Sequence, residues 1–389
     1  MASSTIHRRV STRDSLREQP DDDKFSTVRR RLKFSISLDE DEDTSCWANT
    51  WKFCASLLLT SIFLGPFLYS SYQKYHQQPS STISDTLQKD PEAYVAAARE
   101  FFLATADQLS CAKELNITYS QLFMDVKLKK SPALCRKSDT ERCQCPNPTV
   151  PRMRNTTRRK RGNDAWRKAF KRNQEMASSA PEQLDVVFLG DSITEQWLGT
   201  SLGRPNKYAA QVPTLWSEFF GRSHALALGL SGDQCNNLLY RLMNGEMPSS
   251  LNPTAWWILI GTNDYKDDCN RETILAGQLG VLEEALFRKP EARFILQGIL
   301  PRGKDNLLES TQWQDFQWIN DRLACLAELP QLDFFNGTSL FLNGDGETVN
   351  QTLLYDFLYP SYEGHKLWGQ AMIEQLKQLG IWTTNTAGS

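Results

Sequence analysis

The sequence predicts a three-layer α/β domain with a parallel sheet in residues 173–389, preceded by a single transmembrane helix. After residue 184, short apolar runs alternate with longer helical patterns, which is the rhythm of a parallel sheet covered by helices on both faces. Earlier in the chain, an uncharged apolar run stands alone between polar segments, as a membrane-spanning helix would.

The N-terminal part is expected to anchor the protein in a membrane. Residues 1–45 mix basic and acidic runs with few apolar residues, which is typical of a disordered cytosolic tail. Residues 46–75 are interpreted as a signal anchor, because the uncharged run 53–73 spans roughly 30 Å, the thickness of a bilayer core. A cleaved signal peptide is the alternative. Lys and Arg before the run predict a type II orientation, with the remainder in the ER or Golgi lumen or at the cell surface.

Residues 76–172 are expected to form a basic, cysteine-containing stem or linker. Segment 127–172 carries 16 Lys and Arg against 3 Asp and Glu, whereas 173–389 carries 14 against 26. Nucleic-acid binding is not expected, because the basic segment lacks interleaved aromatic residues and any recognisable nucleic-acid-binding fold. The tetrabasic stretch 158–161 is interpreted as solvated linker, with cleavage by a convertase as the alternative.

The compartment decides the chemistry of the cysteines, and an oxidising one favours disulfides. Four stem cysteines suggest two bridges within the stem, with zinc as a weaker alternative: Cys111, Cys135, Cys143 and Cys145. Cys235 and Cys269 follow strand edges and form a further candidate pair. Cys325 lies in an apolar helical stretch and is expected to be a free core thiol. Four sequons favour the same compartment, at Asn116, Asn155, Asn336 and Asn350.

Five strands and four helices are predicted in the C-terminal domain. The strands are expected at 186–189, 225–228, 256–260, 293–296 and 332–335. The helices are expected at 233–243, 272–288, 312–327 and 363–379. In such sheets ligands bind at the carboxyl ends of the strands, so the loops that leave these ends are the place to look for function.

Three of these loops carry residues suited to acyl transfer. The first strand ends in Gly-Asp-Ser192, where the hydroxyl would face a cleft at the N-terminus of a helix. The second leads into Gly-x-Ser-Gly232-Asp and the third into Gly-Thr-Asn263-Asp. The N–H of Gly232, the amide of Asn263 and the N–H of Ser192 would form an oxyanion hole for a tetrahedral intermediate. Each loop taken singly also fits an ordinary tight turn, and Asp191 or Ser192 fits a helix cap.

Taken in this order, the three blocks resemble those of the SGNH (GDSL-like) hydrolase superfamily, especially the catalytic subunits of the intracellular platelet-activating-factor acetylhydrolases. The resemblance covers about residues 184–380. It implies a flavodoxin-like α/β/α fold, with Ser192 as nucleophile and Gly232 and Asn263 as oxyanion donors. It implies no metal and no cofactor, and it leaves a homodimer open.

One block departs from the family's pattern. The family carries Asp-x-x-His near its C-terminus, with the histidine as general base and the aspartate as its orienting partner. Here Asp356 matches, but Tyr359 stands at the histidine position. A tyrosine with a pKa of about 10 is on the order of 0.1% ionised at neutral pH, so Tyr359 does not replace a histidine unless its pKa is strongly depressed. His365 is the one sensible substitute base, and a packing role for it is the preferred alternative.

The sequence therefore predicts a membrane-anchored serine esterase of the secretory pathway. It would remove a small acyl group, such as acetate, from a glycan or a lipid through an acyl-enzyme on Ser192. The alternative is a catalytically impaired binding protein that holds its ligand without turnover. Acyl transfer to a glycan would use the same serine and is a third hypothesis. The expected partners are the acylated substrate and, through residues 53–73, the membrane.

Overall fold

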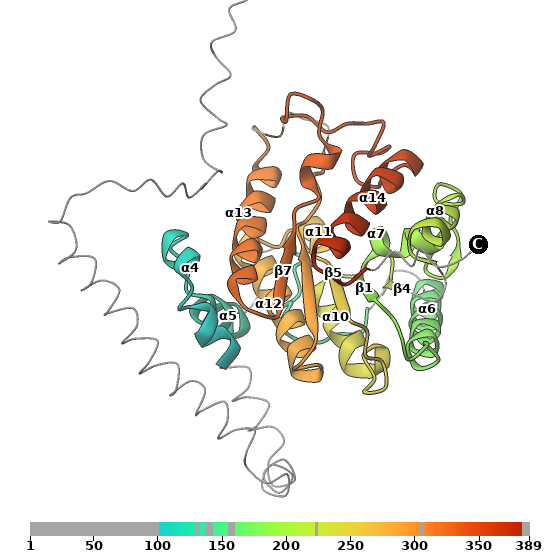
Figure 1. Cartoon of the computed structure of the whole chain (residues 1–389). Coiled ribbons are helices and arrows are strands. Elements are labelled where there is room, and N and C mark those ends of the chain that lie inside the picture. The colour runs from blue at the N-terminus through green and yellow to red at the C-terminus, as the bar shows by residue number, and fades with distance from the viewer. Residues whose placement is uncertain are drawn as a thin grey trace, which may run out of the picture. The chain divides into compact units, whose positions relative to one another are not determined.

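A five-stranded parallel sheet forms the centre of the structure (Figure 1). The computed structural model describes residues 101–129, 133–136, 143–154, 160–221, 225–303, 307 and 309–382. The strands are β1 (Val186–Gly190), β4 (Ala225–Gly229), β5 (Ala255–Leu259), β6 (Arg293–Gln297) and β7 (Leu332–Phe335). All five strands predicted from the sequence are confirmed. Their order, β4-β1-β5-β6-β7, is the flavodoxin-like order that the resemblance implies.

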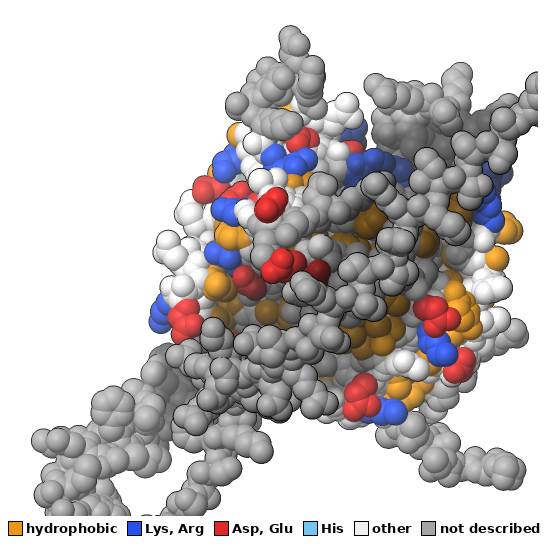
Figure 2. Space-filling view, turned by 90° about the horizontal axis from the view of Figure 1, so that it is seen from above, with side chains coloured by type: hydrophobic (Ala, Val, Ile, Leu, Met, Phe, Trp, Pro, Cys, Tyr) orange, Lys and Arg blue, Asp and Glu red, His pale blue; other side chains and the backbone are white. Residues whose placement is uncertain are grey.

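Helices on both faces of the sheet complete three layers (Figure 1). One group packs side by side: α10 (Cys235–Arg241), α12 (Arg271–Arg288) and α13 (Thr311–Cys325). The other pairs α8 (Val212–Phe219) with α14 (Tyr362–Gln378). The four predicted helices correspond to α10, α12, α13 and α14, and their ends differ from the prediction by one or two residues. The face seen in Figure 2 intermixes acidic and basic side chains.

Short elements connect these layers. Those near the edge of the sheet where the strands end are α7 (Ser192–Glu195), η1 (Gln196–Leu198), α11 (Thr262–Lys266) and the hairpin of β2 (Thr200–Ser201) and β3 (Arg204–Pro205). The others are η2 (Leu242–Glu246), η3 (Leu326–Glu328) and η4 (Thr338–Phe341).

The strand register brings three loops to one edge of the sheet. Gly190 ends β1 and pairs with Gly229 of β4 on one side and Leu259 of β5 on the other. Position 229 requires glycine, because a methyl group there would collide with the backbone of Glu195 in α7. The loops after β1, β4 and β5 therefore start from neighbouring points, at the place where the strand order reverses.

The described residues of the predicted stem pack against the domain. Its helices α4 (Ser110–Glu114), α5 (Tyr119–Leu128) and α6 (Lys160–Ser178) belong to the described fold. Tyr119 is buried and donates a hydrogen bond to the carbonyl of Arg322 at 2.7 Å. Trp166 of α6 is buried as well. The packing therefore continues across the expected boundary at residue 172, because a few large apolar side chains among many basic ones are enough to attach this segment.

The disulfides also tie the segment to the domain. Cys111 bonds to Cys325 and Cys145 to Cys269, across sequence separations of 214 and 124 residues. Only the bond between Cys135 and Cys143 lies within the expected stem. The predictions of a free Cys325, a Cys235–Cys269 pair and two bridges inside the stem are therefore wrong.

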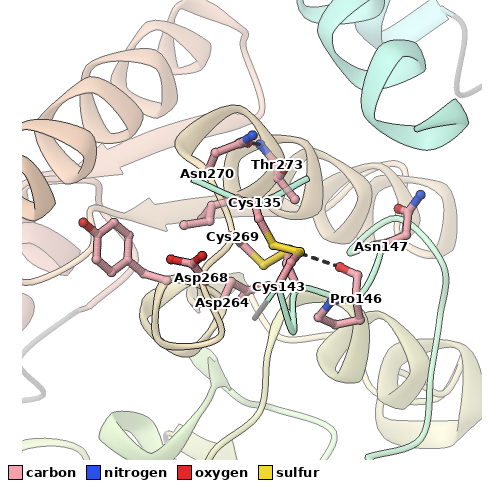
Figure 3. The surroundings of a disulfide bond; sticks show 12 residues. Cys135, Cys143, Pro146, Asn147, Asp264, Asp268, Cys269, Asn270 and Thr273 are labelled. Atoms are coloured by element: carbon pink, nitrogen blue, oxygen red, sulfur yellow. Dashed lines mark hydrogen bonds between the residues drawn. A yellow bond between two sulfur atoms is a disulfide. The ribbon is translucent and has the colours of Figure 1, made fainter. Parts of the chain in front are cut away.

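Packing explains this pairing. The Leu134 carbonyl accepts a hydrogen bond from the N–H of Asn270 at 2.9 Å, and Cys135 forms a backbone bridge with Cys269. Figure 3 shows Cys135, Cys143 and Cys269 gathered beside Asp268 and Asn270. Cys235, by contrast, is a buried free thiol. Burial raises the pKa of this thiol well above its usual value.

Several predictions from the sequence fall outside the described residues. These are the cytosolic tail 1–45, the membrane span 53–73, the sequon at Asn155 and the first half of the tetrabasic stretch, Arg158 and Arg159. In the part of the chain that the structure does describe, no helix has both the length and the apolar character needed to cross a bilayer.

Removing the Cys111–Cys325 bond should cost more stability than removing the Cys135–Cys143 bond. Loop-closure entropy of the unfolded chain predicts a loss of about 5 kcal/mol for the long loop and about 2.5 kcal/mol for the short one. The two double serine variants, Cys111→Ser/Cys325→Ser and Cys135→Ser/Cys143→Ser, serve as matched controls for each other in denaturant unfolding. Equal losses in free energy would contradict the assignment of the long bridge.

Candidate active site

Ser192 lies at the start of α7, directly after β1. Asp191 caps this helix, and its carboxylate accepts a hydrogen bond from the N–H of Ile193 at 2.9 Å. Ser192 is largely buried, yet it contributes to the wall of a cavity. The β1 strand and the capped helix thus fix the backbone that carries the candidate nucleophile.

Tyr359 contacts Ser192 directly. Its hydroxyl donates a hydrogen bond to the Ser192 Oγ at 3.0 Å. Burial raises the pKa of Tyr359, although the hydrogen bond with Ser192 acts in the opposite direction. The phenol therefore keeps its proton at neutral pH and acts as a donor towards the serine. It occupies the place of a general base without being able to accept the serine's proton.

His365 lies in the core and does not contact Ser192. Its Nδ1 is 2.9 Å from the carbonyl oxygen of Ser361, and its ring packs edge-to-face against Trp197 at 4.9 Å. Burial lowers the pKa of His365 to about 4, so the ring is neutral at physiological pH. Among the described residues, Nε2 has no hydrogen-bond partner. Nothing in this position favours the role of base over the role of packing.

Asp356 supports a turn. Its exposed carboxylate accepts hydrogen bonds from the N–H groups of Leu358 at 3.1 Å and Tyr359 at 2.8 Å. Phe357, which lies between Asp356 and Leu358 in the sequence, has a φ of +62°, in the left-handed region. Asp356 therefore orients the backbone of Tyr359 and does not contact its side-chain hydroxyl.

The two candidate oxyanion donors lie in the loops after β4 and β5. Gly232 has a φ of +82°, which favours glycine. The Asn263 amide donates to the carbonyl of Asp233 at 2.9 Å and to the Asp191 carboxylate at 3.3 Å. The structure thus brings Asn263 next to the residue that precedes Ser192, as the sequence blocks predict for neighbouring loops.

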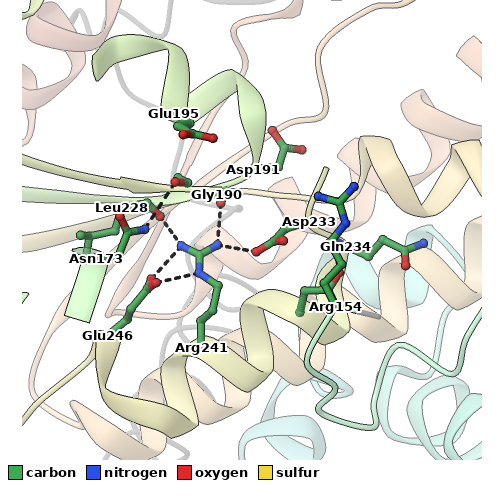
Figure 4. Close-up of polar contacts among 12 residues, drawn as sticks. Arg154, Asn173, Gly190, Asp191, Glu195, Leu228, Asp233, Gln234, Arg241 and Glu246 are labelled. Carbon is green, nitrogen blue, oxygen red and sulfur yellow. Dashed lines mark hydrogen bonds and ion pairs between the residues drawn. The ribbon is translucent and has the colours of Figure 1, made fainter. Parts of the chain in front are cut away.

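Arg154 adds a cation to these loops. Its guanidinium donates to the carbonyl of Ser231, and a methyl group at position 232 would collide with it. Figure 4 shows it beside Asp233 and Gln234. Arg154 comes from the basic segment that the sequence assigns to the stem, and no local sequence signal connects it with a loop 77 residues further on.

A buried ionic network lies beneath the edge (Figure 4). The fully buried guanidinium of Arg241 pairs with Asp233 at 2.9 Å and with Glu246 at 2.7 Å. It also donates to the carbonyls of Gly190, at 2.9 Å, and Leu228. These contacts link the last residues of β1 and β4 to the loop that contains Gly232.

The buried carboxylate of Glu195 stabilises the side of the site that faces the β2–β3 hairpin. It accepts hydrogen bonds from the N–H of Ser231 at 2.7 Å and from its hydroxyl at 2.6 Å. It also accepts from Thr200 Oγ1 and from the N–H groups of Leu202 and Gly203, at 2.8 to 3.0 Å. One carboxylate therefore fixes the β2–β3 hairpin to the loop after β4.

Ser192 opens into a cavity of about 680 Å³. Its lining is almost entirely polar or aromatic and consists of Ser192, Gln196, Ser201, Pro205, Asn206, Lys207, Tyr208, Ser231, Tyr355, Asp356 and Tyr359. A second cavity of about 300 Å³ is lined in part by Arg154, Gly232, Asn263 and Lys266.

This arrangement agrees with the comparison to known proteins. Residues 188–367 match the model of the GDSL-like Lipase/Acylhydrolase family. This match supports the similarity of the domain to the SGNH superfamily. The family is one of acyl ester hydrolases, which gives the serine, the oxyanion loops and the cleft a common chemistry.

Similar proteins include two human enzyme subunits. The chain is 28% identical over 219 residues to platelet-activating factor acetylhydrolase IB subunit alpha2 of Homo sapiens, covering 56% of this chain and 86% of the relative. It is 29% identical over 191 residues to the human alpha1 subunit, covering 49% and 74%. A solved GDSL-like lipase from Bacteroides thetaiotaomicron superposes with a TM-score of 0.43 at 21% identity, covering 54% of this chain and 98% of that one.

Sequence reasoning missed several residues of the SGNH site. Glu195 and Arg241 lie in predicted or adjacent helices, but their roles depend on loops that meet only in the folded chain. Tyr355 and Tyr208 line the cavity without belonging to any family block. Glu195 stands between Thr194 and Gln196, so the local sequence does not distinguish this carboxylate from an ordinary polar residue of a surface helix.

The SGNH site should make the folded state more stable at mildly acidic than at alkaline pH. Burial raises the pKa of Asp191 and Asp264 to about 7 and that of Asp233 to about 6. Between about pH 4 and 7 the folded state thus holds protons that the unfolded chain has released, and stability falls as pH rises. The lowered pKa of His365 acts in the opposite direction, but it is one group against three.

Unfolding free energies measured from pH 5 to pH 8 test this expectation. Asp191→Asn should flatten the decline, because it removes one of the three raised carboxyl groups. Parallel pH curves for the parent and Asp191→Asn would show that Asp191 titrates alike in the folded and unfolded states.

Proposed function

We propose that the SGNH domain binds an acyl ester at Ser192 and that its own hydrolytic turnover is strongly reduced compared with family members that carry a histidine at position 359. The contact that supports this proposal is the 3.0 Å hydrogen bond from the Tyr359 hydroxyl to the Ser192 Oγ. A protonated phenol at that position donates to the serine oxygen but already carries its proton, so it cannot remove the serine's proton as a base.

The missing step is proton removal. As the serine attacks a carbonyl carbon, its proton must pass to a base, which in related enzymes is an imidazole with a pKa near 6.5. Tyr359 already holds its proton, and burial raises its pKa further. His365, the other candidate, packs against Trp197 with no contact to Ser192. Oxyanion donors and ligand binding alone still accelerate acyl transfer by about 10³ to 10⁴ over water in a serine enzyme without its triad, so slow turnover is expected to remain.

The ligand-holding parts of the site support binding. The loops with Gly232 and Asn263 are braced by buried charges, and Ser192 faces a cavity large enough for a small ester and part of its alcohol. These features do not require a base. The proposal therefore assigns the retained architecture to recognition of an acylated ligand.

An active esterase is the second candidate function. It is favoured by the family match and by the guanidinium of Arg154 at the Gly232 loop, where a cation would stabilise the negative charge of a tetrahedral intermediate. In that case a base must reach Ser192 through a rearrangement, or the substrate itself must supply one.

The setting of the domain is proposed as well. We place it in the lumen of the secretory pathway or outside the cell, attached to the membrane through residues 53–73. Three disulfides in the described chain support an oxidising compartment. The sequon asparagines Asn116 and Asn336 are exposed, as glycan attachment would require.

Replacing Tyr359 by histidine should restore hydrolysis. The parent protein is expected to cleave 4-nitrophenyl acetate slowly, and Tyr359→His should raise kcat/KM by about 10²-fold, the lower end of what a general base contributes. A fluorophosphonate probe should label Ser192 in Tyr359→His much faster than in the parent.

Two controls make the result specific. Tyr359→Phe removes the hydrogen bond without providing a base and should show no such gain, and Tyr359→His/Ser192→Ala should be inactive. Rapid turnover by the parent that His365→Ala abolishes would overturn the proposal in favour of a relocated base.

A further inference from the structure

Three tyrosines form a continuous wall from solvent to the candidate nucleophile. Tyr208 and Tyr355 stack with ring centroids 5.6 Å apart and an interplanar angle of 19°. Tyr355 and Tyr359 repeat this geometry at 6.3 Å and 19°, and Tyr359 bonds to Ser192. We call these three residues the tyrosine ladder. Its outer member, Tyr208, is 62% exposed, although most large aromatic side chains of the described domain are buried.

Outside the ladder, the cavity is lined by Pro205 and by residues with polar side chains. Among the residues that line the cavity, Pro205 is the only aliphatic one, and no Leu, Ile, Val, Met or Phe contributes. The alkyl chain of a lipid gains its binding free energy from apolar surface, and here that surface comes from ring faces, Pro205 and the alkyl stem of Lys207 rather than from a pocket of aliphatic side chains. A sugar, in contrast, combines hydroxyl groups with C–H faces that pack on aromatic rings. The lining thus fits a carbohydrate better than a lipid chain.

Gln196 lies beside the ladder, and its side chain forms a hydrogen bond with Tyr355. Its side chain is 3% exposed and lines the same cavity, and its Oε1 has no hydrogen-bond partner among the described residues. A buried acceptor of this kind costs free energy unless a donor satisfies it. Because this oxygen has almost no accessible surface, a ligand hydroxyl would reach it only after the Gln196 amide turns toward the cavity.

The ladder is held in place by the same contacts that fix the catalytic loops. Glu195 binds the β2–β3 hairpin that leads to Tyr208, and the Tyr208 N–H donates to Asn206 Oδ1 at 3.1 Å. The Tyr355 N–H donates to the Tyr359 carbonyl at 3.1 Å. Preorganised rings lose little entropy on binding, which favours their use as a recognition surface.

Lys207 covers part of this surface without closing it. Its ammonium group lies 4.7 Å from the centre of the Tyr208 ring, and the lysine is exposed. An exposed cation–π contact contributes only about 0.5–1 kcal/mol, so a sugar that packs on Tyr208 displaces it at small cost.

From these observations we infer that the acyl group bound at Ser192 is carried by a glycan, and that the tyrosine ladder with Gln196 is the subsite that binds its sugar rings. The inference rests on the proposed function for the location of the acyl group. It names the substrate class, an O-acylated oligosaccharide, that the sequence leaves open between glycan and lipid.

Direct binding measurements on the full-length protein in phosphatidylcholine nanodiscs, free of detergent, test this inference. The Ser192→Ala form prevents turnover, and the probes are O-acetylated xylo-, manno- and galacto-oligosaccharides, their deacetylated counterparts, and phosphatidylcholine vesicles containing a 2-acetyl phospholipid. We expect at least one acetylated oligosaccharide to bind more tightly than its deacetylated form. Tyr208→Ala should weaken that binding about tenfold, through loss of the exposed ring.

Two variants control for the ring and the fold. Tyr208→Phe keeps the stack and should bind within about twofold of the parent, whereas Tyr362→Ala removes an exposed tyrosine outside the cavity and should change nothing.

The inference is overturned if no acetylated oligosaccharide of the panel binds, if only the lipid vesicles bind, or if Tyr208→Ala binds as well as the parent. These outcomes are independent of the hydrolysis test, because 4-nitrophenyl acetate contains no sugar. The chain can therefore gain turnover with Tyr359→His and still fail here, or bind glycans and gain no turnover.

Discussion

The contacts of Arg241 hold together the edge of the sheet on which the site is built. Its buried guanidinium joins the carbonyl ends of β1 and β4 to Asp233 and Glu246. Because every partner is buried, removal of one leaves a charge without compensation, at a cost of about 3–5 kcal/mol. Trp166 also donates to Asp233, at 2.6 Å, so the network reaches into the segment that precedes the sheet. The loop geometry at Gly232 thus depends on an interaction that never touches a ligand.

Glu195 has the corresponding role on the side of the cavity, but by different means. Its carboxylate is buried without a paired cation, and hydrogen bonds from backbone and hydroxyl groups compensate the lost hydration instead. Such donors have fixed positions, so the carboxylate sets the distance between the β2–β3 hairpin and Ser231. Neither Glu195 nor Arg241 needs a catalytic base for this function. The scaffold of the site is therefore independent of the residue at position 359.

The parts of the structure that could be predicted are those with a local or periodic signal. Each strand is a short and mainly apolar run, and Ser192, Gly232 and Asn263 follow strands that lie next to one another, so the sequence places them at one edge. The disulfides and the position of Arg154 have no such signal. They depend on the basic segment before the sheet, which packs through isolated side chains such as Tyr119. The high charge of this segment predicts a solvated linker instead of a packed one. The stacking of Tyr355 in the cavity wall could not be predicted either, because its partner Tyr208 lies far away in the sequence.

Position 359 shows how one substitution changes the chemistry of a site while the fold stays the same. A histidine there would accept a proton from Ser192, whereas the tyrosine donates a hydrogen bond to it, stacks on Tyr355 and extends the aromatic wall as far as the nucleophile. Asp356 stabilises the turn by accepting hydrogen bonds from backbone N–H groups. These bonds do not depend on which side chain stands at position 359. In the proposed function, the ring that completes the aromatic wall and the base that would activate the serine require the same place, so a tyrosine there would favour recognition over turnover.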